Sequence, residues 1–314
     1  MQSFHKSVLL KEILDILRPK ENDGLLVDGT LGEGGHTEAF LQTYPKLKVI
    51  GIDVDAEIQE LAKIRLSAFG DRVSYYLGWS DVFFEDYPSS YDKPNLILLD
   101  LGISMYHYVA SKRGFSFAVD ESLDMRLSPS LALKASDIVN SYPREQIADI
   151  LKSYGEERWA FNIASSIVKK RNLKKIETAK ELADLICEAI PAKYRYGRTN
   201  PATKSFQALR IAVNNELSRL PRLLKLSFDS LKVGGRMGVI TFHSLEDRIV
   251  KQYFKSLEKA CVCPPSFPIC KCGKTPSAKI LTKKAVCPTE EEVACNNAAR
   301  SAKFRAIEKI KESA

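Results

Sequence analysis

A glycine-rich turn directly follows an apolar run that ends in an acid. The stretch VDGTLGEGGHT, residues 27–37, places Gly32, Gly34 and Gly35 shortly after Asp28. Glycines let a backbone turn tightly and approach a ligand without a Cβ in the way. Asp53 closes the next apolar run, 21 residues beyond Gly32, where an open α/β sheet holds the carboxylate that binds ribose hydroxyls. The spacing predicts a site for an adenosine-containing cofactor.

The charge of Asp28 discriminates between the candidate cofactors. A dinucleotide would bring a pyrophosphate to this turn, and an acid at the end of the strand would repel it. S-adenosylmethionine instead carries a cationic ammonium and sulfonium, which Asp28 would attract, while amides of the glycine turn bind its carboxylate. The alternative is a structural turn whose acid caps the following helix. We expect S-adenosylmethionine and a contact from Asp28.

Asp100 ends a further apolar run within LLDLGIS and is the predicted catalytic residue. Methylation of a pyrimidine at carbon 5 needs a cysteine nucleophile, and the sequence has none near this run. An exocyclic amine needs only acceptors that align its lone pair with the sulfonium. The site therefore favours N-methylation, although an aspartate here could also cap a loop.

The elements that must position these acids alternate along the chain. Apolar runs with the length of buried strands occupy residues 25–28, 48–53, 73–77, 95–100 and 235–242, and helix-like segments separate the first four. This alternation predicts a doubly wound parallel sheet. From 111 to 203 the periodicity is helical, so we expect an inserted all-helical domain between two parts of a discontinuous domain, 1–110 and 204–314. The helix that returns to the sheet is expected to break near Pro221.

The composition of the chain indicates which partners it binds and where in the cell it acts. The chain has 314 residues, of which 45% are hydrophobic, and it contains no apolar run long enough to span a membrane. With charges in its first residues where a signal peptide would be apolar, we expect a cytoplasmic protein. Seven cysteines, most of them in the last quarter, indicate reduced thiols. A net charge of +8 makes nucleic acid the first partner to consider.

Many segments together resemble one family, the bacterial small-subunit ribosomal RNA cytosine-N4 methyltransferases of the RsmH or MraW type. They include HKSVLLKE, DGTLGEGGHT, GIDVD, LLDLGIS, YGEERWA, PATKSFQALRIAVNNEL, GGRMGVITFHSLEDRIVK and EEEVACNNAARSAKFRAIE. The resemblance covers nearly the whole chain. It implies a class I S-adenosylmethionine-dependent methyltransferase with a Rossmann-like α/β sheet, acting on a cytidine of 16S rRNA in the small ribosomal subunit, with a homodimer possible.

The same resemblance assigns cofactor contacts. They fall on Gly34, Gly35, His36, Asp53, Asp100 and an aromatic residue after the third strand, which looks like Trp79. Trp79 could stack on adenine or could pack between two loops. His107 stands where the family usually has a glutamine that contacts the cofactor. Its imidazole could keep one hydrogen bond, sensitive to pH near neutrality, or could belong to a flexible lid without a ligand contact.

Two further motifs have both a functional and a structural interpretation. In FHSLEDR, Ser244 and Asp247 have the spacing of a helix capping box, whereas Phe242 and His243 would line the pocket for a flipped base. The basic clusters at 169–175 and 193–198 could be solvated surface, but we favour contact with RNA phosphates and unpaired bases.

The cysteine-rich segment allows two interpretations. Cys261, Cys263, Cys270 and Cys272 form two C-x-C pairs, which could bind zinc or could be reduced thiols in a Pro-rich loop. We predict no metal. For the whole chain, the alternatives to the enzyme are a non-catalytic ribosome assembly factor that binds S-adenosylmethionine and a nicotinamide dehydrogenase, which Asp28 disfavours.

Overall fold

The computed structural model describes residues 6–20, 23–195, 197, 200–260, 263, 272–273 and 275–312. The chain folds into two compact units. The sheet unit comprises Met1–Ile103 and Ser218–Ala314, and the helical unit comprises Ser104–Leu217. The helical unit thus includes a short helix after residue 103 and a long helix ending at Asn214, which the sequence analysis assigned to the other domain.

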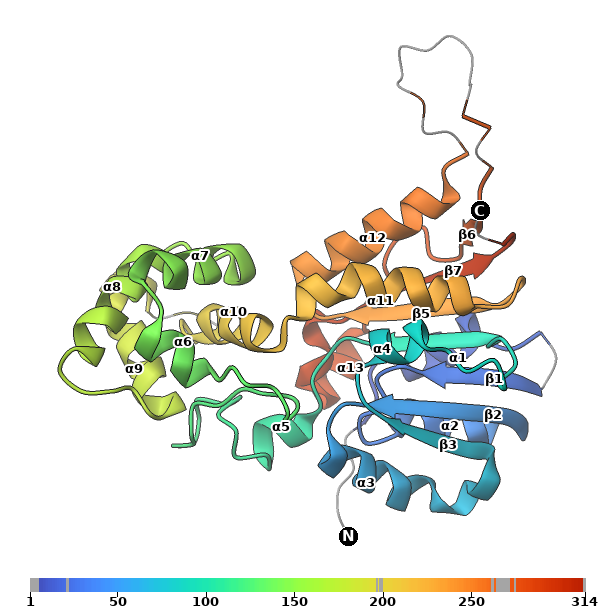
Figure 1. Cartoon of the computed structure of the whole chain (residues 1–314), viewed down its shortest axis with the longest axis horizontal. Helices are drawn as coiled ribbons and strands as arrows, with labels where there is room; N and C mark the ends of the chain where they lie inside the picture. The colour runs from blue at the N-terminus through green and yellow to red at the C-terminus, as the bar shows by residue number, and fades with distance from the viewer. Residues whose placement is uncertain are drawn as a thin grey trace. The chain divides into compact units, whose positions relative to one another are not determined.

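The sheet unit contains an open seven-stranded sheet in the order β3-β2-β1-β4-β5-β7-β6 (Figure 1). All pairs from β3 to β5 are parallel, and β7 runs antiparallel to both β5 and β6. This topology confirms the predicted Rossmann-like α/β class. The strands are β1 (Asp23–Asp28), β2 (Lys46–Asp53), β3 (Val73–Leu77), β4 (Leu96–Asp100), β5 (Arg236–Thr241), β6 (Ala278–Ile280) and β7 (Lys303–Lys309).

Helices cover both faces of this sheet, so successive strand side chains enter two different cores. In β4, Leu96 and Leu98 pack in one apolar cluster, whereas Ile97 and Leu99 pack in the other. Strands buried on both faces appear as continuous apolar runs, which explains why the central strands of the parallel part were predictable. The first cluster is covered by α1 (Leu10–Ile16), α2 (Gly35–Thr43) and α3 (Ala56–Leu66), the second by α4 (Ser80–Glu85), α11 (Glu216–Ser230) and α12 (Ser244–Glu258).

Strands β6 and β7 were not predicted, because charged residues interrupt the apolar pattern of β7. Those charges have partners in the fold. Arg305 pairs with Asp247 at 2.6 Å, and the fully buried Lys309 donates to the carbonyls of Asp229 and Leu231 at 3.0 and 2.8 Å. Satisfied in this way, charged side chains are tolerated in a strand with a buried face.

The helical unit has its own apolar core, to which Ile138, Leu151, Ile163, Leu182 and Leu209 contribute. Its elements are α5 (Met105–Val109), α6 (Ala135–Ser141), α7 (Arg144–Gly155), α8 (Ala160–Arg171), α9 (Ala179–Ala189) and α10 (Thr203–Asn214). No helix within the described ranges is both long and apolar enough to cross a membrane.

The helical break predicted near Pro221 is wrong. It occurs at Asn215, whose φ of 54° ends α10, and Pro221 lies inside α11, five residues after its start. Asparagine adopts the left-handed conformation more readily than most residues. Next to it, the Asn214 side chain accepts from the Leu127 amide at 2.7 Å and donates to the Met125 carbonyl at 2.8 Å. These bonds keep α10 within the helical unit.

Candidate active site

Acidic side chains gather at the carboxyl edge of the parallel sheet. Asp53, Asp28 and Asp100 end β2, β1 and β4, which are consecutive strands in the sheet, and Glu246 follows β5 in the first turn of α12. In an open α/β sheet, ligands bind at this edge. Four carboxyl groups here favour a ligand that carries positive charge.

Asp28 is almost completely buried, with 1% of its surface exposed. It accepts from the Thr37 hydroxyl at 2.7 Å and from the Thr30 amide at 3.3 Å. Burial raises the pKa of this carboxyl, and the Thr37 hydrogen bond opposes the rise. The geometry favours the structural interpretation, in which Asp28 fixes the turn and the start of α2. A direct cofactor contact from Asp28 stays a prediction.

The glycine turn is held by its own amides. Gly32 donates to Asp53 Oδ2 at 2.8 Å, and Gly34 donates to the Leu31 carbonyl at 2.9 Å. Both glycines have positive φ, 54° and 79°. Because these two amides are occupied, the carboxylate of an amino-acid ligand would fall to the first-turn amides of α2, at Gly35 and His36, which have no acceptor within the helix.

The turn and Asp53 fit an adenosine and a methionine moiety. A Cβ built on Gly32 would meet no atom closer than the Thr30 carbonyl oxygen at 4.0 Å, so the space beside this glycine is open. Asp53 is oriented from both sides, because its Oδ1 also accepts from the Asp55 amide at 2.9 Å. A carboxylate fixed in this way is suited to accept the two hydroxyls of a ribose.

Asp100 is the acid with the most perturbed environment. Its Oδ1 accepts from the Gly102 amide at 3.1 Å, and its backbone amide donates to the Thr30 hydroxyl. Burial raises its pKa to about 6; nearby His36 and the Gly102 bond oppose the rise, whereas the carboxylates of Asp28 and Glu246 reinforce it. With 22% of its side chain exposed, Asp100 can still meet a ligand.

His36 joins the cofactor turn to Asp100. Its Nε2 lies 2.9 Å from the Val8 carbonyl, which can only accept, so the Nε2 carries a proton. Its Nδ1 lies 3.8 Å from Asp100 Oδ2. The sequence analysis predicted His36 only as a cofactor contact. Its link to Asp100 could not be read from the sequence, because it depends on a carbonyl 28 residues earlier.

The predicted capping box of Ser244 and Asp247 is wrong by one residue. His243 is the N-cap of α12; its Nδ1 accepts from the Glu246 amide at 3.4 Å, and Glu246 Oε2 accepts from the His243 amide at 3.3 Å. Asp247 is instead committed to Arg305. Phe242 does lie beside the Asp100 loop, since a Cβ on Gly102 would collide with its ring.

Trp79 precedes α4, and the Arg219 guanidinium lies over its ring, 4.2 Å from the centroid. Arg219 also pairs with the buried Asp81. One face of the indole is therefore occupied by protein, which favours the packing interpretation for that face. Stacking of Trp79 on adenine stays a prediction.

His107 lies in the helical unit, on α5. It is buried, with 4% of its surface exposed, and its ring centroid is 4.9 Å from that of Phe115. This packing differs from the flexible lid that was one of the two predictions for this position. Its contact with the cofactor stays a prediction.

The basic clusters lie in the helical unit, and part of the first is structural. Arg171, at the end of α8, donates to the carbonyls of Val139 and Tyr142 at 2.9 and 2.7 Å. From the second cluster, Tyr194 is 43% exposed and its ring centroid lies 5.5 Å from that of Trp159. Contact with RNA stays a prediction for both clusters.

Of the four cysteines of the predicted zinc alternative, Cys261 and Cys270 lie outside the described residues. Cys187, Cys287 and Cys295 are free thiols. Within the described part of the chain, no three His, Cys, Asp or Glu side chains are grouped so as to hold a metal ion.

The whole chain also resembles known proteins. The pattern of the MraW methylase family matches residues 2–310. A Treponema denticola protein named ribosomal RNA small subunit methyltransferase H is 60% identical over 310 residues, covering 99% of this chain and 98% of that protein. Proteins of the same name from Treponema pallidum and Heliobacterium modesticaldum are 42% and 46% identical, covering 97% and 98% of this chain and 92% and 99% of theirs. The chain belongs to the MraW methylase family.

Proposed function

We propose that this protein transfers a methyl group from S-adenosylmethionine to the exocyclic N4 amine of a cytidine in small-subunit (16S) ribosomal RNA. The names of its relatives support the RNA substrate. The observation that carries the chemistry is Asp100, a partly exposed carboxyl at the sheet edge whose pKa is raised to about 6. Such a group can bind an amine and accept its proton near neutral pH.

The row of acids supports the choice of cofactor. S-adenosylmethionine, when bound, supplies an electrophilic methyl group on a sulfonium. Asp53 would hold the ribose, and the first turn of α2 would hold the methionine carboxylate. Asp28 and Asp100 would favour the positive charges, whereas the pyrophosphate of a nicotinamide dinucleotide would face the same carboxyl groups and be repelled.

Asp100 positions the acceptor. A stacked cytosine cannot present its amine to the cofactor, so the base must leave the RNA stack, and Phe242 offers an apolar wall beside Gly102. The carboxylate of Asp100 accepts one N–H of the amine, which directs the nitrogen lone pair toward the methyl group. Positioning of this kind contributes on the order of 7 kcal/mol or more to catalysis.

The proton then has a route away from the product. As the N–C bond forms, the bond between the methyl group and sulfur would break and leave its electron pair on sulfur. The positive charge on N4 is then removed when Asp100 Oδ2 takes an N–H proton and the N–H electrons return to nitrogen. The Nδ1 of His36, 3.8 Å from that oxygen, carries a lone pair while Nε2 is bonded to Val8. His36 can therefore take the proton from Asp100 and restore the carboxylate.

The test is mass spectrometry of nucleosides from small-subunit RNA of cells lacking this protein. Purified subunits and naked RNA are each incubated with S-adenosylmethionine and either wild type, Asp100→Asn or the exposed control Asp92→Asn. We expect N4-methylcytidine with wild type and the control, and none with Asp100→Asn. If wild type binds the cofactor but adds no methyl group to either substrate, the assembly-factor alternative replaces the enzyme. Methylation of another base or atom would overturn the cytosine-N4 assignment.

A further inference from the structure

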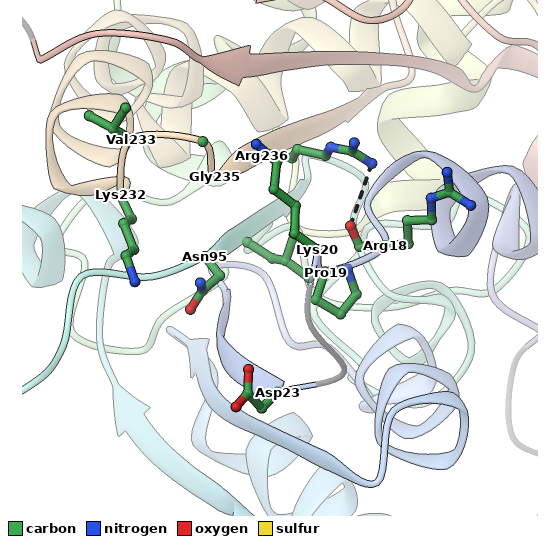
Figure 2. A pocket seen from close by; sticks show the side chains of 11 residues that line it. Arg18, Pro19, Lys20, Asp23, Asn95, Lys232, Val233, Gly235 and Arg236 are labelled. Carbon is green, nitrogen blue, oxygen red and sulfur yellow. Dashed lines mark hydrogen bonds between the residues drawn. The ribbon is translucent and has the colours of Figure 1, made fainter.

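A second pocket lies at the amino edge of the same sheet, opposite the acids. It has a volume of about 160 Å³ and is formed where β1, β4 and β5 begin (Figure 2). The lining residues are Arg18, Pro19, Lys20, Asp23, Asn95, Leu96, Lys232, Val233, Gly234, Gly235 and Arg236. Because β4 is five residues long, at about 3.3 Å per residue this pocket is roughly 15 Å from Asp100. It is not part of the candidate active site.

Four cations from distant parts of the sequence line this pocket. Arg18 and Lys20 follow α1, Lys232 lies between α11 and β5, and Arg236 begins β5. Asp23 is the acid among the lining residues, and Glu308, outside the lining, pairs with Lys20 at 3.0 Å and with Arg236 at 3.4 Å. In the described part of the chain, Arg18 and Lys232 have no acidic partner. The pocket therefore keeps a positive excess.

Backbone bonds fix the pocket. The Lys232 amide donates to the Pro94 carbonyl at 3.0 Å, and the Gly234 amide donates to the Lys309 carbonyl at 2.7 Å. Gly234 has a φ of 82°, and a Cβ there would lie 3.0 Å from the Lys20 ammonium. Arg236 is held by the Ile16 and Arg18 carbonyls, the second bond being visible in Figure 2. A ligand would thus meet a pocket whose walls are already in place.

We propose that this pocket binds a phosphate group of the RNA backbone, at a point in the substrate distant from the methylated base. The proposal rests on RNA being the substrate. Arginine and lysine side chains that line a concave surface are usual partners of phosphate oxygens. Phosphate contacts position a nucleic acid without reading its sequence. A contact on the far edge of the sheet would be available only to a folded RNA or a subunit that extends beyond the target loop.

The test compares Arg18→Gln, Lys232→Gln and the double variant with wild type and with Lys63→Gln. Lys63 is a matched single-charge control on α3, paired with Glu60 outside the pocket. Affinity for full-length small-subunit RNA is measured against salt concentration. Loss of this one phosphate contact in the double variant should reduce the magnitude of the slope of log K against log salt by nearly one, and each single variant should reduce it by less. Methyl transfer at saturating RNA should stay unchanged, because neither residue is near Asp100.

A second arm separates RNA from a free anion. Inorganic phosphate should raise the melting temperature of wild type and of Lys63→Gln, and less that of the double variant. If phosphate binds in the pocket but the RNA salt slope is the same in all variants, the pocket takes a free anion and the proposal is overturned. An equal reduction of the slope in Lys63→Gln would also overturn the proposal, since the change would then come from the lower net charge of the protein and not from the pocket. If wild type transfers no methyl group while the slope still changes, the phosphate site stands and the proposed function fails.

Discussion

Replacing Asp100 by asparagine should make the sheet unit more stable while abolishing methyl transfer. The carboxyl is only partly exposed and lies near two other acids, and its pKa is raised from 3.8 to about 6. Asparagine has nearly the same shape and can still accept from the Gly102 amide, but it carries no charge. Function would therefore be maintained here at a cost in stability, as is common at active sites.

The magnitude follows from the pKa difference. A rise of about 2 units corresponds to about 3 kcal/mol, at 1.36 kcal/mol per unit. Below pH 4 the carboxyl is protonated in both the folded and the unfolded chain, and it costs nothing. Between pH 4 and pH 6 the folded state binds more protons than the unfolded state, so stability falls as the pH rises, and above pH 6 the loss is complete. Asp100→Asn should therefore match wild type at pH 4 and exceed it by at most about 3 kcal/mol at pH 8.

Denaturant unfolding can test this in the sheet unit alone. The chain has two tryptophans, Trp79 in the sheet unit and Trp159 in the helical unit. In a Trp159→Phe background, Trp79 fluorescence reports the relevant transition. The exposed control Asp92→Asn should change stability by less than about 0.5 kcal/mol at either pH. An Asp100→Asn variant that is less stable than wild type at pH 8, or equally shifted at both pH values, would refute the reasoning.

Three other predictions follow from the same contacts. Single-turnover transfer should rise with pH around a midpoint near 6 and fall about tenfold per unit below it. The variant His36→Asn should move the midpoint upward, because His36 lowers the pKa of Asp100. A flat rate in rapid-quench assays from pH 5 to 8 would contradict this. Asp53→Ala should weaken S-adenosylmethionine binding about 100-fold, as measured by calorimetry. The substitution removes the acceptor for the ribose hydroxyls and leaves the Gly32 amide without its hydrogen-bond partner. An unchanged Kd would mean that the ribose binds elsewhere. Asn215→Val should lower the free energy of unfolding of the helical unit by about 1–2 kcal/mol, measured by Trp159 fluorescence, because valine adopts the left-handed conformation poorly. Asn215→Gly should leave it nearly unchanged. Equal effects of the two substitutions would argue against a left-handed residue at this break.

The central parallel strands β1, β2, β4 and β5 could be predicted because they are largely buried, so each is an apolar run that ends in a polar residue. The antiparallel strand β7 could not, because its charges are satisfied by residues far away in the sequence, as Arg305 is by Asp247. The position of the break between α10 and α11 was not predicted, for a related reason. Pro221 is the stronger local signal, yet the chain turns at Asn215, where the preceding residue is bonded to the loop near Met125.

In the candidate site, the sequence predicted that all three aspartates lie at the carboxyl edge of the sheet, but it could not distinguish their roles. The three occur in the same local pattern, and only their partners differ. Asp28 has its oxygens bonded to Thr30 and Thr37 and is closed to solvent, so it can act on a ligand chiefly through its charge. Asp53 is oriented by two amides and keeps the geometry of a hydroxyl acceptor. Asp100 combines partial exposure, a raised pKa and a nearby imidazole, and of the three it alone has the properties that proton transfer requires.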